Sequence, residues 1–140
     1  MMPYQSQAIA VFLKMLPSGC TRILEIGSDI GGEVLSTMAI KTRALVVGVN
    51  PATDFPGLVK LTRSFPVRGD GRFLPFSDGS FDAVLSIATM EHVNGIELLL
   101  AEITRVLKNK GLFYTTFEPI WSSGQGHHIY AKVGEKEARF

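Results

Sequence analysis

The first forty residues switch between helix-like and strand-like patterns of apolar side chains. Over residues 5–16 the apolar side chains fall at positions i, i+3, i+4 and i+7, which is the spacing of one helix face. Residues 21–26 form a short run that ends in a glycine-rich turn, as a strand does before a tight connection. Residues 33–41 carry an acid at the start and a base at the end, which suits the dipole of a helix. The pattern predicts a helix followed by a strand–turn–helix unit.

The middle of the chain continues with strand-like runs. Residues 44–49 are almost purely aliphatic and β-branched, which indicates a strand buried on both faces, as in a parallel sheet covered by helices. A short strand is predicted near Val67, before a turn-rich stretch, and another over residues 81–86. These runs add further strands to the same sheet.

The clearest helix covers about residues 92–108, where the apolar side chains form one stripe and the charged ones lie away from it. Gly111 is expected to end this helix, and residues 112–117 to form a fifth strand. Because strands alternate with helices, we expect an α/β fold, with a right-handed, doubly wound, mainly parallel sheet and helices on both faces. The segment from Pro119 onward has no strong period and is interpreted as a loop with room for a short terminal helix.

Length and charge narrow the classes of function. The 140 residues contain no repeat, low-complexity tract or charge block, so we expect one domain over residues 1–140. A formal net charge of +1 gives no broad field for nucleic acid or anionic lipid, and neither partner is expected. No apolar run approaches the ~18 residues of a membrane span, and no signal peptide is recognised. Cys20 has no second cysteine to pair with, which fits a reducing compartment, so a cytoplasmic location is expected.

The turn after the first predicted strand is the first candidate site. Ligands of open parallel sheets bind at the carboxyl ends of the strands, and glycines there let the backbone approach a ligand. A dinucleotide fingerprint would be Gly-x-Gly-x-x-Gly, and Gly27, Asp29 and Gly32 stand at those three positions. The carboxylate of Asp29 would meet a pyrophosphate with like charge and bulk, which disfavours a nicotinamide oxidoreductase. Alternatively, the turn only packs a helix on a strand.

Four segments together resemble one known family. LEIGSDIGG is similar to the first motif of class I S-adenosylmethionine-dependent methyltransferases, and ALVVGVNP to their second strand. RGDGRFLPFSDGSFDAVLSIATMEHV resembles the third and fourth motifs of the small-molecule type 11 branch, and ITRVLKNKGLFYTTFEP resembles its fifth strand with the preceding residues. The resemblance covers about residues 23–119. It implies a Rossmann-like fold, S-adenosylmethionine as cofactor, and methyl transfer to a small-molecule or carbohydrate-type acceptor, with oxygen as the expected acceptor atom.

The resemblance assigns roles to residues after the first two strands. Glu25 would hold the ammonium group of the cofactor, directly or through water. Gly27 and Gly31 would let the loop that contains Asp29 close around the methionine moiety. Asn50 stands where the family usually has an acid that takes both ribose hydroxyls, and because an amide has only one acceptor oxygen we expect weaker binding there.

Further cofactor contacts are implied after the next two strands. Asp70 matches the acid that accepts a hydrogen bond from the adenine amino group, and Gly71 would supply backbone beside the ring. In isolation, Asp70 could be a turn aspartate between two glycines, but the following Leu74-Pro75-Phe76 and Phe81-Asp82 favour the cofactor role. Ser86 and Ile87, with the following alanine, would line the floor of the cofactor site.

Direct displacement at a sulfonium methyl group needs a base only when the acceptor must lose a proton. Histidine titrates near neutrality, and His127 and His128 follow a Gly-Gln-Gly segment beyond the fifth strand, so they are the candidate catalytic residues; a solvated surface loop is the alternative. Glu118 is a carboxylate candidate, and His92 is interpreted as a helix-start residue packed under the cofactor. We expect no metal site, because no Asp, Glu or Cys in the loop completes a three-ligand set with the two adjacent histidines.

Three departures from the family pattern support an alternative function. They are Asp29 in the glycine loop, Asn50 at the ribose position, and Asn109-Lys110 where the family commonly has Pro-Gly. None of them is disabling by itself. The alternative is a non-catalytic or partner-dependent methyltransferase-like domain that binds S-adenosylmethionine.

The resemblance also makes this chain short. Family members continue past the fifth strand into a sixth and an antiparallel seventh, whereas only residues 118–140 follow Phe117, too few for that hairpin and its helix. We therefore expect a cofactor-binding core over residues 1–118 and a loop or tail over residues 119–140. A homodimer contact or another partner would then cover the open sheet edge.

Overall fold

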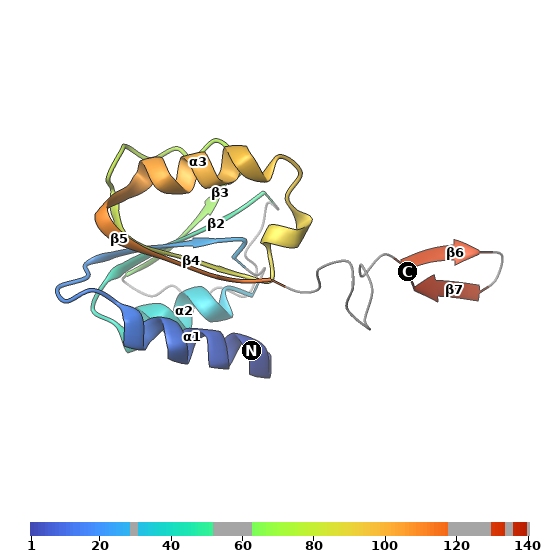
Figure 1. Ribbon diagram of the computed structural model, residues 1–140. Coiled ribbons are helices and arrows are strands. Elements are labelled where there is room, and N and C mark those ends of the chain that lie inside the picture. The colour runs from blue at the N-terminus through green and yellow to red at the C-terminus, as the bar shows by residue number, and fades with distance from the viewer. Residues whose placement is uncertain (29–30, 52–62, 118–129, 134–135, 140) are drawn as a thin grey trace.

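Five parallel strands form one sheet with the order β3-β2-β1-β4-β5 (Figure 1). The structure is a computed structural model that describes residues 1–28, 31–51, 63–117, 130–133 and 136–139. The strands of this sheet are β1 (Arg22–Ile26), β2 (Leu45–Asn50), β3 (Ser64–Arg68), β4 (Phe81–Ile87) and β5 (Leu107–Thr116). The predicted α/β fold with a parallel sheet is thereby confirmed, with every predicted strand of the sheet present.

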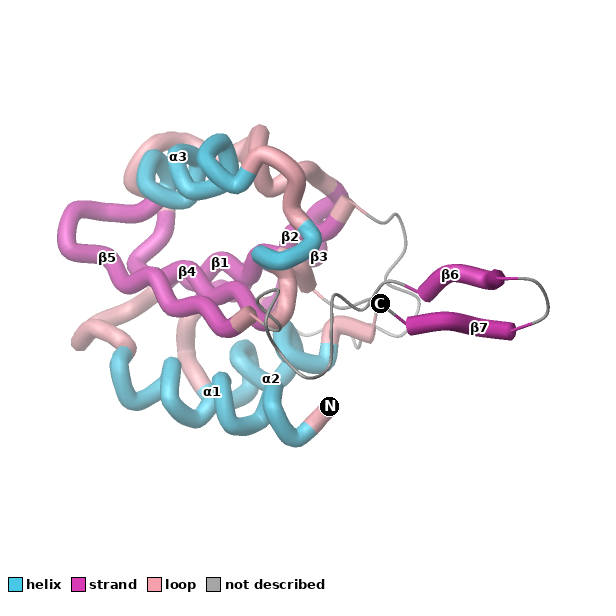
Figure 2. Tube along the Cα trace, turned by 45° about the vertical axis from the view of Figure 1, so that its right-hand side comes forward, coloured by secondary structure: helices cyan, strands magenta, loops and turns pink. Residues whose placement is uncertain are grey.

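Helices cover both faces of the sheet, so the molecule has three layers (Figures 1 and 2). α1 (Pro3–Met15) and α2 (Glu33–Lys41) lie on one face, and α3 (Ile96–Val106) lies on the other. Alternate strand residues point to opposite faces, so Ile23 joins the core cluster under α1 and α2 while Leu24 joins the cluster under α3. Each large apolar side chain buried in this way contributes roughly 1.5–3 kcal/mol. The two clusters therefore hold the helices against the sheet.

The helix predicted for about residues 92–108 is shorter at both ends. Met90–His92 form a separate 3-10 turn, η1, and α3 starts only at Ile96. Gly95 caps it with a φ of 81°, a left-handed conformation that interrupts a continuous helix. At the other end, Leu107 is already extended, and its N–H donates to the Ile103 carbonyl. The chain therefore has a glycine break where the apolar stripe alone predicts helix.

β5 starts five residues earlier than the prediction, and its register against β4 shifts after Leu107. Lys110 has a φ of 64°, which is unusual for a residue with a Cβ. A Cβ on Gly111 would lie 2.8 Å from Cδ2 of Leu107 and 2.9 Å from the Lys108 carbonyl oxygen. The prediction that Gly111 ends α3 is therefore wrong, because this glycine permits close packing inside an irregular strand.

The segment interpreted as a loop contains a hairpin. β6 (Tyr130–Val133) and β7 (Lys136–Arg139) pair antiparallel in a two-stranded sheet of their own. The prediction of a loop with a short terminal helix is therefore wrong for these residues. In the five-stranded sheet β5 and β3 are the edge strands.

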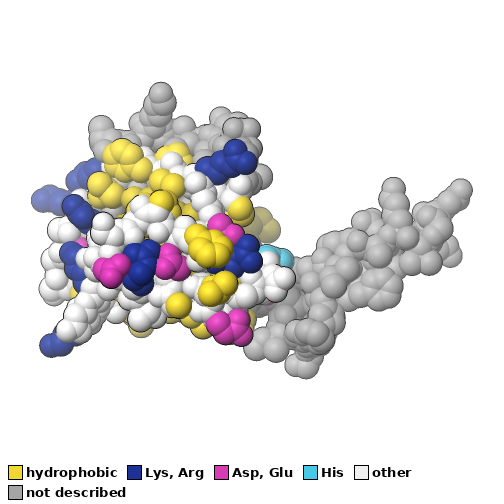
Figure 3. Space-filling model, turned by 90° about the horizontal axis from the view of Figure 1, so that it is seen from above, with side chains coloured by type: hydrophobic (Ala, Val, Ile, Leu, Met, Phe, Trp, Pro, Cys, Tyr) yellow, Lys and Arg dark blue, Asp and Glu magenta, His cyan; other side chains and the backbone are white. Residues whose placement is uncertain are grey.

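The outer face of α3 carries mixed charges. Figure 3, which looks down on this face, shows acidic and basic side chains next to one another and hydrophobic side chains beside them. Leu98 and Leu100 are among the exposed hydrophobic residues of the helix. Within the described ranges no helix combines the length and the apolar character needed to cross a membrane.

Two charged residues of α3 fix the connection that leads into β4. The carboxylate of Glu102 accepts a hydrogen bond from the Leu74 backbone N–H at 2.6 Å. Arg105 donates to the carbonyls of Phe76 and Leu74, at 2.7 Å and 3.0 Å, and also to Asp78. These bonds anchor residues 74–78 against α3, so the turn that precedes them is attached to a rigid element.

Asp82 connects three strands at their amino ends. Its Oδ2 accepts hydrogen bonds from the backbone N–H groups of Thr21 and Arg22, both at 2.9 Å, and from the Thr21 hydroxyl, and its Oδ1 accepts one from Lys108 Nζ at 2.6 Å. Burial alone would raise the pKa of Asp82, but the hydrogen bonds from Lys108, Thr21 and Arg22 outweigh it and lower the pKa to about 2. The ionised carboxylate therefore stabilises the fold.

We expect Asp82→Asn to lower the free energy of unfolding at pH 7 by about 2 kcal/mol, because the folded-state pKa of about 2 lies below the ordinary value of 3.8. This contribution is complete above about pH 4 and is lost as the pH falls toward 2. Urea unfolding between pH 2 and 7 should show the gap between wild type and variant closing over that range. Glu97→Gln, on the exposed first turn of α3, is the control. A gap that is constant with pH would contradict the assignment.

Candidate functional site

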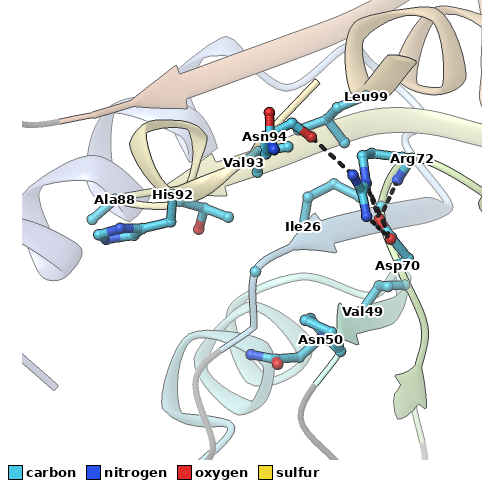
Figure 4. Close-up of a pocket in the computed structure, with 14 residues that line it drawn as sticks. Ile26, Val49, Asn50, Asp70, Arg72, Ala88, His92, Val93, Asn94 and Leu99 are labelled. Atoms are coloured by element: carbon cyan, nitrogen blue, oxygen red, sulfur yellow. Dashed lines mark hydrogen bonds and ion pairs between the residues drawn. The ribbon is translucent and has the colours of Figure 1, made fainter. Parts of the chain in front are cut away.

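A cavity of about 520 Å³ opens at the carboxyl edge of the sheet (Figure 4). Its walls come from the residues that follow β1, β2, β3 and β4 and from the start of α3. Parallel strands place all their carboxyl ends at one edge, which is where open α/β sheets bind ligands. The polar or charged lining residues include Asn50, Asp70, Arg72, Thr89, His92 and Asn94.

The glycine turn after β1 packs directly against the turn after β4. Gly27 has a φ of 79°, and a Cβ at this position would lie 2.1 Å from Oγ1 of Thr89. Its N–H and that of Ser28 both donate to the Val49 carbonyl, at 2.9 Å and 3.1 Å. Glycine is therefore required here twice, by the backbone conformation and by the close approach of Thr89.

Glu25 lies buried behind this turn, with 3% of its surface exposed. The Ser28 hydroxyl donates to its Oε2 at 2.9 Å, and Glu25 pairs across the sheet with Gly48. A Cβ on Gly48 would lie 2.7 Å from Oγ of Ser28, so the absence of a side chain makes room for this hydroxyl. The sequence places a buried carboxylate directly under the glycine turn.

Asn50 links the end of β2 to the same turn. Its Nδ2 donates to the Ser28 carbonyl, and the residue lines the cavity. The amide donor is thus used within the protein, which a carboxylate at this position could not do. Asn50 therefore supports the shape of the glycine turn as well as facing the site.

Asp70 follows β3 and is held by Arg72, two residues further along. Arg72 Nη2 donates to Oδ2 at 2.6 Å, and the Arg72 backbone N–H donates to Oδ1 at 2.9 Å. The side-chain hydrogen bond from Arg72 lowers the pKa of Asp70, and the same bond raises the pKa of Arg72. Asp70 is therefore an ionised acceptor at neutral pH.

The residues after β4 adopt a strained backbone. Ala88 lines the cavity with a φ of 49°, and its N–H donates to the Thr116 carbonyl at 2.8 Å. A left-handed conformation is unfavourable for a residue with a Cβ, and such strain collects at functional sites. Ser86 and Ile87, which precede it, are buried in the sheet and do not line the cavity.

The cavity brings together four of the predicted cofactor residues, Gly27, Asn50, Asp70 and Gly71. Gly31 is exposed and does not line it. The predicted residues Asp29, His127 and His128, with Glu118, lie outside the described residues.

Sequence reasoning missed several lining residues. Arg72 is not among the predicted site residues, although its position two residues after Asp70 is a signal for a local ion pair. His92 was interpreted as packed at a helix start, whereas it is exposed and lines the cavity from η1. Thr89 and Asn94 carry no local signal, because only the fold brings them to the cavity. Among the described residues, no group of three His, Cys, Asp or Glu side chains is placed to hold a metal ion.

We expect Gly27→Ala to lower the free energy of unfolding by at least about 3 kcal/mol, because it combines left-handed strain with overlap on Thr89. Gly19→Ala is the matched control, since Gly19 has a similar φ of 74° but nothing within 4 Å of an added Cβ. It should cost only about 1 kcal/mol from strain. Equal losses for the two variants in urea unfolding would show that contact with Thr89 has no effect.

Comparison with known proteins places the chain in a family. A sequence model described as methyltransferase domain matches residues 24–115. A demethylmenaquinone methyltransferase of Roseiflexus is 34% identical over 96 residues, which covers 66% of this chain and 40% of that protein. A sterol 24-C-methyltransferase of Aspergillus fumigatus is 34% identical over 100 residues, with 66% and 26% covered.

Solved structures agree with the sequence comparison. Phosphoethanolamine N-methyltransferase 2 of Haemonchus contortus, in complex with S-adenosylmethionine, superposes with a TM-score of 0.71 and 27% identity. The superposition covers 80% of this chain and 28% of that one. The chain thus spans less than half the length of these relatives. It belongs to the class I S-adenosylmethionine-dependent methyltransferases.

Proposed function

We propose that this chain binds S-adenosylmethionine in the cavity at the carboxyl edge of the sheet and acts as a methyltransferase on a small-molecule acceptor. The observation that carries the proposal is the convergence of Gly27, Asn50 and Asp70, from the ends of three different strands, on one cavity. The family model covers all three residues.

The residues present fit this cofactor. A volume of about 520 Å³ lies within the ~300–1,000 Å³ typical of small-molecule sites. The backbone of Gly71 lies close to Leu99, another residue that lines the cavity, because an added Cβ would lie 2.8 Å from Leu99 Cδ1. The polar groups also match: Asp70 is an acceptor suited to an amino group, and the buried carboxylate of Glu25 lies behind the glycine turn, where an ammonium group would approach.

The proposed role of the chain is positioning. When bound, the cofactor supplies a methyl carbon on a sulfonium sulfur; the acceptor forms a bond to this carbon while the carbon–sulfur bond breaks and its electron pair stays on sulfur. Asp70 would orient the adenine ring of the cofactor, and Asn50 would orient its ribose. The packed Gly27–Thr89 contact would keep the methionine end in place. Such alignment lowers the barrier mainly by removing orientational freedom before reaction.

The acceptor class rests on the relatives. Their names describe methylation of demethylmenaquinone, sterols and fatty acids, which supports a small-molecule acceptor for this chain. A carbohydrate-type acceptor, methylated at oxygen, is the narrower hypothesis. The bases proposed for this hypothesis, His127 and His128, come after β5 in the sequence and lie outside the described residues.

We expect S-adenosylhomocysteine at about 100 times its Kd to raise the melting temperature by roughly 10 °C, because such an excess of ligand stabilises a protein by about 2.7 kcal/mol. Asp70→Ala should weaken binding about 10- to 100-fold through loss of a hydrogen bond to a charged group. A thermal melt with and without ligand measures the melting temperature, and calorimetric titration measures the Kd, with Glu97→Gln as the control for removal of one acidic charge. No binding to the wild-type chain at millimolar ligand would refute the proposal.

We expect radiolabelled methyl transfer from S-adenosylmethionine to at least one member of a panel of quinols, sterols, fatty acids and sugars. If a histidine removes the acceptor proton, His127→Ala or His128→Ala should reduce kcat about 100-fold while S-adenosylhomocysteine affinity stays the same. Full activity in both variants would exclude the two histidines as bases.

The second candidate is a non-catalytic or partner-dependent domain that binds S-adenosylmethionine. One observation favours it: the donor of Asn50 is engaged by the Ser28 carbonyl, so the ribose position also has a structural task. The partner would be a second copy of the chain or another protein on the edge strand β5. Cofactor binding without product in the acceptor panel, followed by product after a partner is added, would favour this candidate.

A further inference from the structure

The guanidinium of Arg72 bridges two walls of the cavity (Figure 4). On one side it contacts the carboxylate of Asp70 through Nε and Nη2. On the other side its Nη1 donates to the Asn94 carbonyl at 3.0 Å. Asn94 precedes Gly95, the N-cap of α3, and a Cβ on Gly95 would lie 3.8 Å from Cδ of Arg72. One side chain therefore connects the turn after β3 to the start of α3.

Arg72 occupies most of the acceptor capacity of Asp70. A carboxylate has about four acceptor positions, two on each oxygen. Oδ1 accepts from the Arg72 backbone N–H and from Nε, and Oδ2 accepts from Nε and Nη2. The Nε–H is shared, at 3.0 Å and 3.1 Å, so it can settle on one oxygen and leave one position on the other. Asp70 therefore has room for one further N–H donor.

The ion pair has little value for stability alone. The side chains of Asp70 and Arg72 are 39% and 36% exposed, and ion pairs of this exposure stabilise proteins little. The bidentate geometry and the third anchor on Asn94 nevertheless immobilise a long side chain at the cavity wall. Because this anchoring adds little to stability, we expect it to affect how the cavity recognises its ligand.

We propose that Arg72 is a positioning residue that determines base specificity: it holds Asp70 as an acceptor with one accessible position, which takes an exocyclic amino group and rejects a 6-oxo purine. This inference rests on the proposed function, in which Asp70 contacts the adenine of the cofactor. An adenine amino group donates to the carboxylate. A 6-oxo purine instead presents a carbonyl oxygen, whose lone pairs are repelled by the negative carboxylate of Asp70. Because Arg72 holds this carboxylate in place, it cannot turn away from the carbonyl oxygen.

The test compares two ligands that differ at this position, S-adenosylhomocysteine and its 6-oxo analogue S-inosylhomocysteine. Calorimetric titration of the chain gives the ratio of their Kd values. In Arg72→Ala this ratio should fall about tenfold, because Asp70 loses the three guanidinium contacts and keeps only the backbone N–H on Oδ1, so that Oδ2 can turn toward the ring N–H of the 6-oxo base. Arg72→Lys should recover part of the ratio, since an ammonium retains the charge but lacks the planar fork. Arg68→Ala, which removes an exposed arginine outside the cavity lining, should leave it unchanged.

The outcomes separate this inference from the proposed function. If Arg72 only supports the fold, Arg72→Ala and Arg72→Lys will weaken both ligands by the same factor, and the constant ratio overturns the inference. If the wild-type chain binds S-adenosylhomocysteine and Asp70→Ala weakens it while the Arg72 variants keep the ratio, only the specificity role fails. If the wild-type chain binds neither ligand, both the proposed function and this inference fail. The melting temperature of Arg72→Ala should stay within about 3 °C of wild type, which excludes unfolding as the cause.

Discussion

The contact between Gly27 and Thr89 is the constraint on which the cavity depends. β1 and β4 are neighbours in the sheet, so the two turns that follow them leave the same edge side by side. They fit together only because Gly27 has no side chain where Oγ1 of Thr89 lies. Once this contact is made, the turn after β1 is fixed between Thr89 and the carbonyl of Val49, and the buried carboxylate of Glu25 is covered. The shape of the ligand site thus follows from close packing of backbone, and the polar groups are added to it.

Strands were predictable from the sequence because burial on both faces leaves a local record. A run such as residues 44–49 has few polar side chains, and the structure places β2 there between two covered faces. The ends of α3 were not predictable to the same degree. The apolar stripe continues across Gly95, whose left-handed φ starts the helix later, and past Val106, where the backbone is already extended. Backbone conformation at single residues decides these boundaries, and hydrophobic spacing carries no information about it.

The site residues also divide into those that local sequence pattern could predict and those that it could not. Asp70 and Asn50 could be proposed because each follows a predicted strand, and strand ends in a parallel sheet meet at one edge. The function of Arg72 could not be predicted in this way. Its bond to Asp70 is local. Its bond to the Asn94 carbonyl joins residues 22 positions apart and depends on the path of the chain between η1 and α3. A backbone carbonyl has no residue type that a sequence could reveal, so this half of the bridge is visible only in three dimensions.

The position of Asp82 at the amino ends of the strands divides the molecule into two regions with different tolerance to change. The carboxylate ties together the starts of β1, β4 and β5, while the cavity lies at the opposite end of the same strands. Substitutions of polar side chains at the cavity edge, away from the tightly packed Gly27, leave this anchor in place, so the sheet can remain folded while its ligand-binding side chains change. Such a separation allows position 50 at the cavity edge to be an amide, whose donor is used on the glycine turn, without any change at the anchor. Evolution or engineering could change ligand specificity through the polar side chains of the cavity while the anchor at the amino ends of the strands maintains stability.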